Sequence, residues 1–555
     1  MPERSNWIRP ADSLSPEEQG YLKKRRPLLE EKWVQRIADV GLTAPPRLPV
    51  VGMALSGGGY RAMISGAGMA FQPNETAGSV GDLLGLSSYV SGLSGGSWAV
   101  SSFYANNGIP PTKLANNTWD LSSNLVFPDH DIAEWLANLG CGVYRKNQKG
   151  FATQWTDYWG LALSDHLFPA EYRTDKSPNL RWSDIPRISP RVQKADLPWP
   201  IIIAVEREEG EKVVGDNSTI YEFTLAEFGA WQWGSKTRSQ GAFTPVRNLG
   251  TRMDNGVPQD MSKCYENFDN AGDTLMQKLK DKSWSELGIF GGPLDVGQDV
   301  VEDVLKIVSD LGEDVAVYPN PFYKWTGQEN PNGNNEKLTL LDGGLADENV
   351  PLEPLLQPER AVDAIFAFDN SADSPQKWPK GISLYTTYQK SLNLSQKYNI
   401  PETMPPVPPR EGFVNDDLNK RPVFFGCDIS TLPTIIYIPN APWSHWSNHS
   451  TFQLAYGLNE TLVLIDNGRR SLELNGTVPE WGLCLTCAMI NNAVLQSGQP
   501  HEDKCKACLD RWCWNGVVNA TEGKATEYQA MGQFPAFPQE PSAYGSEERD
   551  GRDGL

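Results

Sequence analysis

Residues 88–105 read SYVSGLSGGSWAVSSFYA and contain the pattern that decides the fold. After the apolar residues at 82–86, residues 88–92 predict a short strand, and residues 97–105 predict a helix. Between them, Gly92-Leu93-Ser94-Gly95-Gly96 matches the pattern G-x-S-x-G. In that pattern a serine stands on a sharp strand-to-helix turn that exposes its hydroxyl, and larger side chains two positions away would collide with the neighbouring strand and helix. Ser94 is therefore the candidate nucleophile.

The same succession of strand, glycine turn and helix also occurs earlier in the chain. An apolar run at 49–55 leads into Ser56-Gly57-Gly58-Gly59, and small and apolar residues follow at 60–71. Glycines leave backbone N–H groups unobstructed, as an oxyanion hole or a phosphate cradle requires. A nucleotide-binding loop is disfavoured because neither the P-loop pattern nor G-x-G-x-x-G fits. Two such units within about 55 residues predict an α/β fold with a parallel sheet.

Three further apolar runs, at 196–206, 337–341 and 361–368, predict additional strands. Asp342 follows the second run and precedes two glycines, whereas Asp369 follows the third. Ligands bind at the carboxyl ends of strands in open α/β sheets, so we expect the glycine loop, Ser94 and both aspartates at one edge. An Asx-turn at the strand end is the alternative, purely structural role of Asp342.

Two arrangements could activate the serine. In the first, Asp342 removes the proton from the Ser94 hydroxyl directly. In the second, a histidine does so within a triad, and the chain order of the α/β-hydrolases then favours His445 or His449. Asp369 is the reserve candidate for the acid of such a triad.

The composition is that of an acidic globular protein. Of the 555 residues, 39% are hydrophobic and 21% are charged, and the formal net charge is -20. Such a surface repels phosphate backbones, which argues against nucleic acid as a partner. No apolar run approaches the roughly 20 residues that span a bilayer. Residues 1–10 lack the apolar stretch of a signal peptide, so an exported form would be a mature or trimmed one.

Sequons and cysteines nevertheless indicate export. The chain has eight N-x-S/T sequons and eight cysteines. Roughly three or four sequons are expected by chance from ordinary Ser and Thr usage. The glycosylation candidates are Asn74, Asn116, Asn217, Asn393, Asn448, Asn459, Asn475 and Asn519. The disulfide candidates are Cys141, Cys264, Cys427, Cys484, Cys487, Cys505, Cys508 and Cys513.

Four of the cysteines also have the spacing of a zinc site. Cys484-Leu-Thr-Cys487 and Cys505-Lys-Ala-Cys508 match a four-thiolate site, although Cys513 would then be left over. An oxidising compartment favours disulfides instead, and the expectation is disulfides with no metal. Because the cluster at 484–513 holds five cysteines, at least one bridge must then reach Cys141, Cys264 or Cys427.

Three motifs taken together resemble one family. Ser56-Gly-Gly-Gly-Tyr-Arg61-Ala-Met63, Gly92-Leu-Ser94-Gly-Gly-Ser-Trp98 and Leu-Leu-Asp342-Gly-Gly344 resemble, in this order, the fungal lysophospholipase (phospholipase B) family. That family is related to the group IV cytosolic phospholipases and more distantly to patatins. The cysteine-rich segment Arg511-Trp-Cys513-Trp-Asn-Gly516 looks like that of secreted fungal members. The resemblance spans residues near 20 to 520.

The resemblance implies a patatin-like α/β fold of the cytosolic-phospholipase type. A central, mostly parallel sheet flanked by helices would carry large insertions that form a lid and a disulfide-rich C-terminal segment. The sequence itself predicts a helical lead-in at 1–45, because Ser15-Pro16-Glu17-Glu18 is a helix-start signal with serine at the cap. The catalytic domain would follow at 46–520. That domain would contain insertions at 106–195 and 207–335, and a polar tail would follow at 521–555.

The resemblance also implies a Ser-Asp dyad, with Ser94 as nucleophile and Asp342 as its base. Gly58 and Gly59 would form the oxyanion hole, and Arg61 would hold a phosphate or stabilise the site. From chemistry alone, a structural ion pair at the helix start is the alternative role of Arg61. The substrates would be lysophospholipids, and diacyl phospholipids in addition, met transiently at a micelle or membrane surface. Neither a cofactor nor calcium would be required, and no stable protein partner is expected.

Overall fold

The computed structural model describes residues 6–73, 82–125, 143–144, 146–172, 180–207, 214, 218–234, 239–263, 265, 268–269, 316–326 and 330–519. The predictions made for Asn74, Asn217, Cys141, Cys264 and the tail at 521–555 lie outside the described residues.

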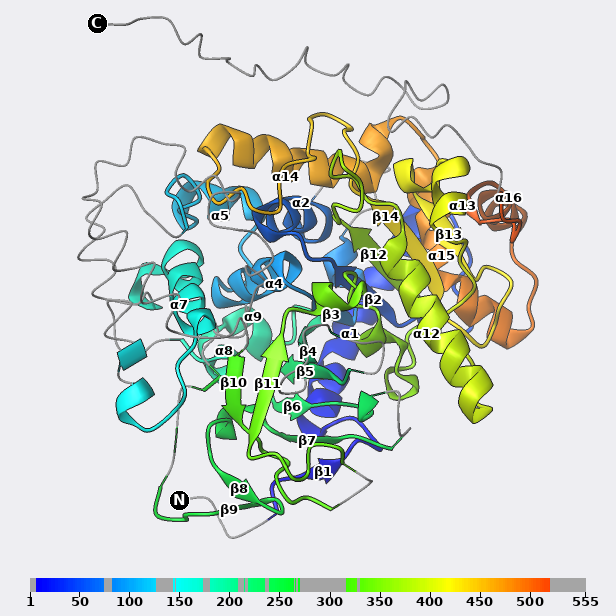
Figure 1. Cartoon of the computed structure of the whole chain (residues 1–555). Helices are drawn as coiled ribbons and strands as arrows, with labels where there is room; N and C mark the ends of the chain where they lie inside the picture. Colours follow the sequence, from blue (N-terminus) through cyan, green and yellow to red (C-terminus); the bar gives the residue numbers. More distant parts are fainter. Residues whose placement is uncertain are drawn as a thin grey trace, which may run out of the picture.

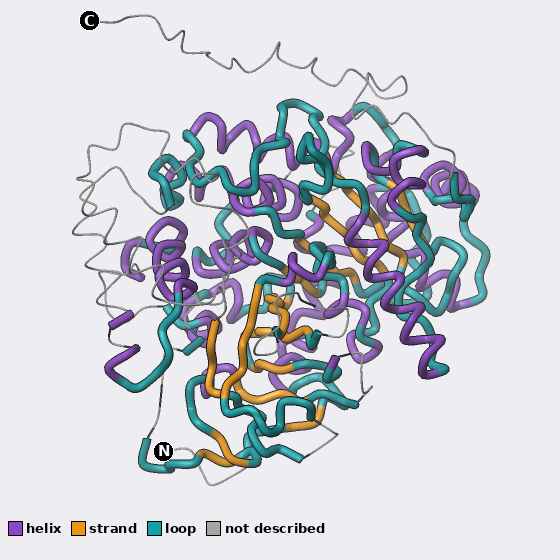
Figure 2. Tube along the Cα trace, in the orientation of Figure 1, coloured by secondary structure: helices purple, strands orange, loops and turns teal. Residues whose placement is uncertain are grey.

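One large sheet runs through the molecule, and its centre is parallel (Figure 1). In spatial order, the central strands are β4 (Trp199–Glu206), β3 (Tyr89–Gly92), β2 (Val51–Leu55), β12 (Ala364–Asp369) and β14 (Thr434–Pro439). All residues of these strands are buried, as expected for parallel strands that are covered on both faces. Helices lie on both sides of the strands in Figure 2. The predicted α/β fold with a parallel centre is confirmed.

Antiparallel strands extend this centre at both ends. Beyond β14 lies β13 (Val423–Phe425). Beyond β4 follow β5 (Ile220–Thr224), β6 (Glu227–Gly229), β7 (Ala242–Pro245) and β1 (Arg9–Pro10). The assignment of the whole stretch 207–335 to a lid-forming insertion is therefore wrong for 220–245, because these residues add strands to the sheet. A separate small pair is formed by β8 (Met253–Asp254) and β9 (Val257–Pro258).

Asp342 reaches the site by an unexpected route. The strand before it, β11 (Lys337–Leu341), forms a hairpin with β10 (Ala316–Pro319) and pairs antiparallel with the end of β4. Leu341 lies opposite Val205, three residues beyond Ile202, where the pairing of β4 with β3 ends. β11 is therefore part of the large sheet and pairs with β4 beyond the point where β3 ends. The predicted strand at 337–341 before Asp342 is confirmed, and its pairing with β4 is antiparallel.

The helices on one face are packed through glycine. α2 (Gly59–Phe71) lies between α4 (Gly95–Ala105) and α14 (Leu458–Glu473) (Figure 1). A Cβ added to Gly68 would lie 2.2 Å from the Ile465 carbonyl oxygen, and one added to Gly468 would lie 2.2 Å from the Ser65 carbonyl oxygen. The backbones of α2 and α14 are thus in direct contact, which only glycine permits.

The remaining α-helices cover the other surfaces of the sheet and its ends. They are α1 (Pro16–Asp39), α3 (Leu83–Leu86), α5 (Pro111–Asn117), α7 (Trp155–Leu167), α8 (Ile185–Ile188), α9 (Pro190–Gln193), α12 (Ile382–Tyr398), α13 (Arg410–Asn415), α15 (Trp481–Ser497) and α16 (Asp503–Trp512). None of the helices in the described ranges is both long enough and apolar enough to cross a bilayer.

The predicted N-terminal helix is confirmed as α1, and it packs on the core. The Ser15 hydroxyl accepts a hydrogen bond from the Glu18 amide at 3.0 Å, so serine caps the helix as its sequence indicates. Trp33 is fully buried, and the Arg25 guanidinium donates to the carbonyl oxygens of Ser87 and Ala195. The lead-in is therefore part of the same folded body.

A buried ion cluster fastens α1 to the sheet. The Arg360 side chain, only 1% exposed, donates to Glu18 Oε1 at 3.0 Å and to both carboxylate oxygens of Glu222 at 2.8 Å. Both glutamates are also buried. The two negative charges raise the pKa of Arg360 above its ordinary value despite its burial, so the cation is strongly held.

Replacing Arg360 with methionine is expected to lower the free energy of unfolding by about 3–5 kcal/mol, because two buried carboxylates lose their counterion. The urea midpoint at pH 8 measures the loss. Arg26→Met is the matched control, because it breaks an exposed (i, i+4) pair with Glu30 that is worth about 0.5 kcal/mol or less. Equal midpoints for the two variants would contradict a stabilising role of the buried cluster.

Three disulfides close the C-terminal region. Cys484–Cys508 and Cys487–Cys505 join α15 to α16, and Cys427–Cys513 ties the end of α16 to the loop after β13. The zinc alternative is therefore wrong, because all four of its thiolates are paired as disulfides. The expected bridge from the cluster to a distant cysteine is confirmed by Cys427. Among the described sequons, Asn116, Asn393 and Asn459 are exposed, and their occupancy stays a prediction.

Candidate active site

Ser94 occupies a strained turn between β3 and α4. Its φ is 50° and its ψ is -123°, a conformation that non-glycine residues rarely adopt. A Cβ added to Gly96 would lie 2.1 Å from the Leu55 carbonyl oxygen, and one added to Gly92 would lie 2.8 Å from the Gly96 carbonyl oxygen. Both flanking glycines are therefore required, as the sequence pattern predicts. The turn also places Ser94 at the N-terminus of α4, where the helix dipole favours negative charge.

Replacing Gly96 with alanine is expected to cost about 3 kcal/mol or more of stability, because the overlap is with backbone atoms that no side-chain rotation relieves. The urea midpoint should fall accordingly. Gly20→Ala is the control: its added Cβ meets no atom within 4 Å, and it should stabilise α1 by roughly 0.5–1 kcal/mol. A Gly96→Ala protein with an unchanged midpoint would show that the turn tolerates a side chain.

The glycine loop after β2 lies beside this turn. The Gly57 amide donates to the Asn349 carbonyl oxygen at 3.1 Å. Gly58 and Gly59 have φ values of 137° and 62°, which glycine adopts without strain. In the part of the chain that the structure describes, the amides of Gly58 and Gly59 have no hydrogen-bond acceptor. These two amides are the donors that an oxyanion hole needs.

Ser94 and Asp342 line one cavity of 370 Å³, together with Gly58 and Arg61. Both side chains are buried, at 8% and 7% exposure. The other lining residues are Gly344, Asp347, Asn349, Ser371, Ala372, Asp373, Ile382, Ser383, Thr451 and Phe452. Asp342 Oδ1 accepts a hydrogen bond from the Gly344 amide at 2.9 Å. The Asx-turn and a position in the site are thus compatible roles for this aspartate.

The side chain of Leu93 packs closely against glycines of both loops, and Asn349 Oδ1 adds a second obstacle 2.4 Å from a Cβ placed on Gly57. A Cβ on Gly57 would lie 2.9 Å from Leu93 Cδ2, and one on Gly343 would lie 2.7 Å from Leu93 Cδ1. Leu93 is fully buried and contacts both the glycine loop after β2 and the loop that follows Asp342. The residue before the serine therefore sets the spacing of the other two parts of the site.

Arg61 is fully buried and bonded to main-chain and hydroxyl oxygens. Its Nε and Nη2 donate to the Asn370 carbonyl oxygen at 3.1 and 3.0 Å. Its Nη1 donates to the His449 carbonyl oxygen at 2.6 Å and to Thr451 Oγ1 at 3.0 Å. Burial lowers the pKa of this guanidinium. None of these acceptors is a carboxylate, so Arg61 does not form the alternative ion pair at the helix start. Its hydrogen bonds instead hold the loops of Asn370 and His449 against the glycine turn.

Sequence reasoning missed Asn349, which connects the parts of the site. Its Nδ2 donates to the Gly57 carbonyl oxygen at 3.1 Å and to Ser371 Oγ at 2.7 Å. With the Gly57 amide bonded to the Asn349 carbonyl oxygen, the glycine loop and the segment after Asp342 are fixed by two reciprocal bonds. No local pattern marks this asparagine, since its partner is 292 residues away.

Asp369, His445 and His449, which only the alternative triad would use, do not line the cavity. Asp369 is fully buried, and its carboxylate accepts hydrogen bonds from the Ser371 amide at 3.0 Å and the Tyr437 hydroxyl at 2.9 Å. His449 Nδ1 faces Gln453 Oε1 at 3.0 Å. Burial lowers the pKa of His445. The described residues lining the cavity include Ser94 and Asp342 but no histidine.

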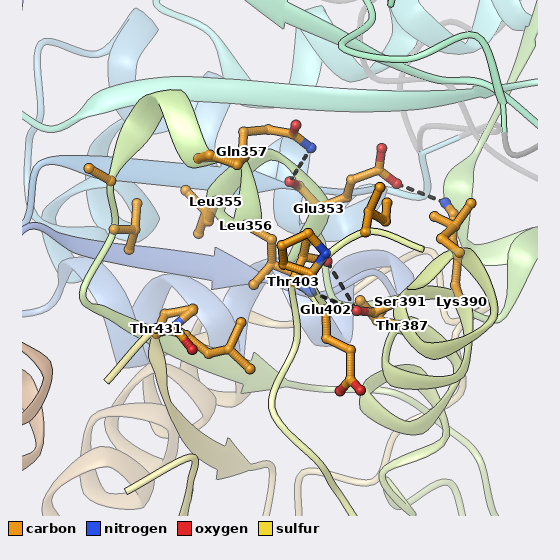
Figure 3. Close-up of a pocket in the computed structure, with 18 of the residues that line it drawn as sticks. Glu353, Leu355, Leu356, Gln357, Thr387, Lys390, Ser391, Glu402, Thr403 and Thr431 are labelled. Atoms are coloured by element: carbon orange, nitrogen blue, oxygen red, sulfur yellow. Dashed lines mark hydrogen bonds and ion pairs between the residues drawn. The ribbon is translucent and has the colours of Figure 1, made fainter. Parts of the chain in front are cut away.

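A larger cavity of 810 Å³ lies at the opposite end of the central strands (Figure 3). Its wall includes Val50, Asp363 and Pro433, which precede β2, β12 and β14. Lys390 in this cavity is paired with Glu348 at 3.0 Å and Glu353 at 2.8 Å. The volume is greater, but neither Ser94 nor Asp342 reaches it, so the smaller cavity is the candidate active site.

Comparison with known proteins identifies the family to which this chain belongs. Residues 51–519 match the family of lysophospholipase catalytic domains. A phospholipase B of Cryptococcus neoformans var. neoformans serotype D is 42% identical over 530 residues, which cover 94% of this chain and 83% of that protein. Lysophospholipase 1 of Aspergillus fumigatus is 36% identical, over 93% of this chain and 86% of that protein.

Solved structures with a similar fold include human GIVD cytosolic phospholipase A2. The TM-score is 0.64 at 17% sequence identity, and the match covers 89% of this chain and 69% of that one. The same protein in complex with methyl gamma-linolenyl fluorophosphonate aligns with a TM-score of 0.60, again at 17% identity, over 89% of this chain and 66% of that one. The expected cytosolic-phospholipase fold is therefore confirmed.

Proposed function

Because the chain belongs to the family of lysophospholipase catalytic domains, we propose that it hydrolyses the fatty-acyl ester bonds of lysophospholipids, with Ser94 as nucleophile and Asp342 as base. The chain is a carboxylic ester hydrolase of the phospholipase B and lysophospholipase group. One observation carries the residue assignment: Ser94, on a strand-to-helix turn with a positive φ, lines the same cavity as Asp342 and Gly58.

The first half of the reaction forms an acyl-enzyme. An Asp342 carboxylate oxygen takes the hydroxyl proton as Ser94 Oγ attacks the ester carbonyl carbon. The oxyanion that forms is stabilised by the amides of Gly58 and Gly59 and by the N-terminus of α4. Collapse of this intermediate breaks the acyl C–O bond, and the proton passes from Asp342 to the leaving glycerol oxygen.

In the second half, water hydrolyses the acyl-serine. Asp342 accepts a proton from the attacking water, the same donors stabilise the second oxyanion, and the proton returns to Ser94 Oγ as the fatty acid leaves. An aspartate with an ordinary pKa of about 4 is ionised above that pH, so a dyad needs no histidine. Arg61 supports the site by holding the His449 and Asn370 main chain, while the phosphate-binding role stays a proposal.

Substrates would be met at a micelle or membrane surface, and diacyl phospholipids are included in the proposal. Three disulfides fit an extracellular protein, so we propose that the enzyme is secreted. No stable protein partner is proposed.

Calcium and other metals are proposed to be dispensable, because protein groups fill each role in the reaction. We expect 5 mM EDTA, an excess of roughly a thousandfold over enzyme, to leave the hydrolysis rate within about 20% of its value without chelator. Zinc or calcium added back provides the control. A loss of rate that either metal restores would contradict the proposed mechanism.

The function is tested with a single-chain lysophosphatidylcholine and a fluorophosphonate. The full chain should release fatty acid from the lysolipid, and the probe should stop the reaction and label one peptide, which contains Ser94. Ser97→Ala is the matched control, because this buried serine lies three residues away on α4 and should leave labelling intact. Labelling of another residue with full loss of activity would reject Ser94.

A further inference from the structure

The mouth of the active-site cavity carries two carboxylates that the reaction does not use. Ser94, Arg61 and Asp342 form the buried floor. Asp347 is exposed and Asp373 is half-buried, so both lie toward solvent on the cavity wall. Three apolar residues share this rim: Ala372, Ile382 and Phe452. An amphipathic rim of this kind suits a substrate that has both a polar head and a hydrocarbon chain.

The charge of the cavity is unbalanced. Its lining holds the carboxylates of Asp342, Asp347 and Asp373 against the single guanidinium of Arg61. The Nε, Nη1 and Nη2 atoms of Arg61 donate hydrogen bonds to the oxygens of Asn370, His449 and Thr451. Within the described residues, no lysine or arginine forms an ion pair with Asp347 or Asp373. A ligand that fills the cavity therefore meets net negative charge at the rim.

Asp373 is held firmly in this position. Its Oδ2 accepts a hydrogen bond from the Lys380 amide at 2.8 Å, which closes the loop between β12 and α12. Burial, with the negative charge of Asp369 adding to it, raises the pKa of Asp373 to about 7, while the amides of Lys380 and Ile382 and the guanidinium of Arg61 oppose the rise. A nearby cation would favour the ionised form of this group.

We propose that Asp347 and Asp373 select the head group of the substrate, so that lysophospholipids ending in an ammonium group are preferred over those with a net negative head group. The inference rests on the proposed function. When the ester reaches Ser94 at the floor, the head group extends toward the rim, where the two carboxylates attract its ammonium and repel a second negative charge. Asp347 and Asp373 are thus specificity residues, whereas Ser94 and Asp342 carry the chemistry.

The test compares lysophosphatidylcholine with lysophosphatidylglycerol of the same acyl chain. Both are diluted in micelles of an uncharged detergent at pH 8, where Asp373 is mostly ionised. The measured quantity is the ratio of kcat/KM for the two lipids. Asp347→Asn and Asp373→Asn should each lower the ratio about three- to fivefold, the size expected of one partly solvated charge pair. Asp428→Asn removes an exposed carboxylate of the loop after β13 and should leave the ratio unchanged.

A second measurement needs no variant. The wild-type ratio should fall toward one as NaCl rises from 0.05 to 1 M, because the Debye length shrinks to about 3 Å. For a short uncharged ester, kcat/KM should change neither with the Asp347→Asn and Asp373→Asn substitutions nor with the NaCl concentration. If the wild type hydrolyses lysophosphatidylcholine but the ratio ignores both the variants and salt, the head-group inference is overturned and the lysophospholipase function stands. Absence of hydrolysis of either lipid would instead reject the function itself.

Discussion

Replacing Ser94 with alanine is expected to lower kcat for lysophosphatidylcholine by about 10⁵- to 10⁶-fold, the loss typical when a nucleophile is deleted from a serine hydrolase. No other hydroxyl combines the strained turn, the adjacent amides of Gly58 and Gly59 and a place beside Asp342 in the described cavity. Fatty-acid release measured under substrate saturation gives the number, and circular dichroism with a melting curve checks the fold.

The accompanying variants separate chemistry from structure. Ser97→Ala should keep nearly full activity. Ser94→Gly should be as inactive as the alanine variant yet melt at a higher temperature, because glycine relieves a positive-φ strain of about 1–3 kcal/mol. Residual activity of Ser94→Ala above about 1% of wild type would mean that another residue attacks the ester.

The Asp342→Asn variant is expected to lose about 10⁴-fold in kcat with its fold intact, by analogy with isosteric changes of catalytic aspartates. The amide oxygen of asparagine can still accept the hydrogen bond from the Gly344 amide, so the turn survives. What disappears is a group able to take the proton of Ser94. The measurement is single-turnover acylation, in which the formation of acyl-Ser94 is followed directly.

Histidine variants provide the control for this assignment. His445→Ala and His449→Ala should retain most activity, since neither ring lines the cavity and His449 offers Arg61 only its carbonyl oxygen. Activity of the wild type should also persist below pH 6, where a histidine base with an ordinary pKa of about 6.5 would be protonated. If the His445→Ala or His449→Ala protein folds but is inactive, the triad mechanism is correct and the dyad mechanism is rejected.

The central fold could be predicted because its signals are local. The apolar run at 49–55 became β2 at Val51–Leu55, and the small-residue stretch at 60–71 became α2 at Gly59–Phe71. The strands at the sheet edge were harder to predict, because β5 to β7 are short and each takes its place by antiparallel pairing with the strand before it, beginning with β5 on β4. The hydrophobic periodicity of a strand does not reveal which strand it pairs with. The antiparallel pairing of β11 with β4 could not be predicted for the same reason.

In the site, too, features set by local sequence could be predicted, whereas those set by contacts between distant segments could not. Ser94 and the glycine loop were found because a strained turn and an exposed amide demand particular residues at particular spacings. Asn349, Ser371 and Asp373 could not be found in this way, since their roles arise from contacts made across loops that follow different strands. The sequence allows Arg61 either a phosphate-binding or a structural role, and the carbonyl oxygens of Asn370 and His449 around it could not be predicted because they come from distant loops.

The glycine contact between α2 and α14 has a consequence for how this protein can diversify. Gly68 and Gly468 each face a backbone oxygen of the other helix, so neither position accepts even one extra methyl group. α2 begins at Gly59, one of the two glycines proposed to hold the oxyanion, so the contact sets the height of that helix above the sheet. In a library selected for heat tolerance, gains should arise on exposed helix faces, while these two codons stay invariant. Homologous helices could be exchanged only as a matched pair.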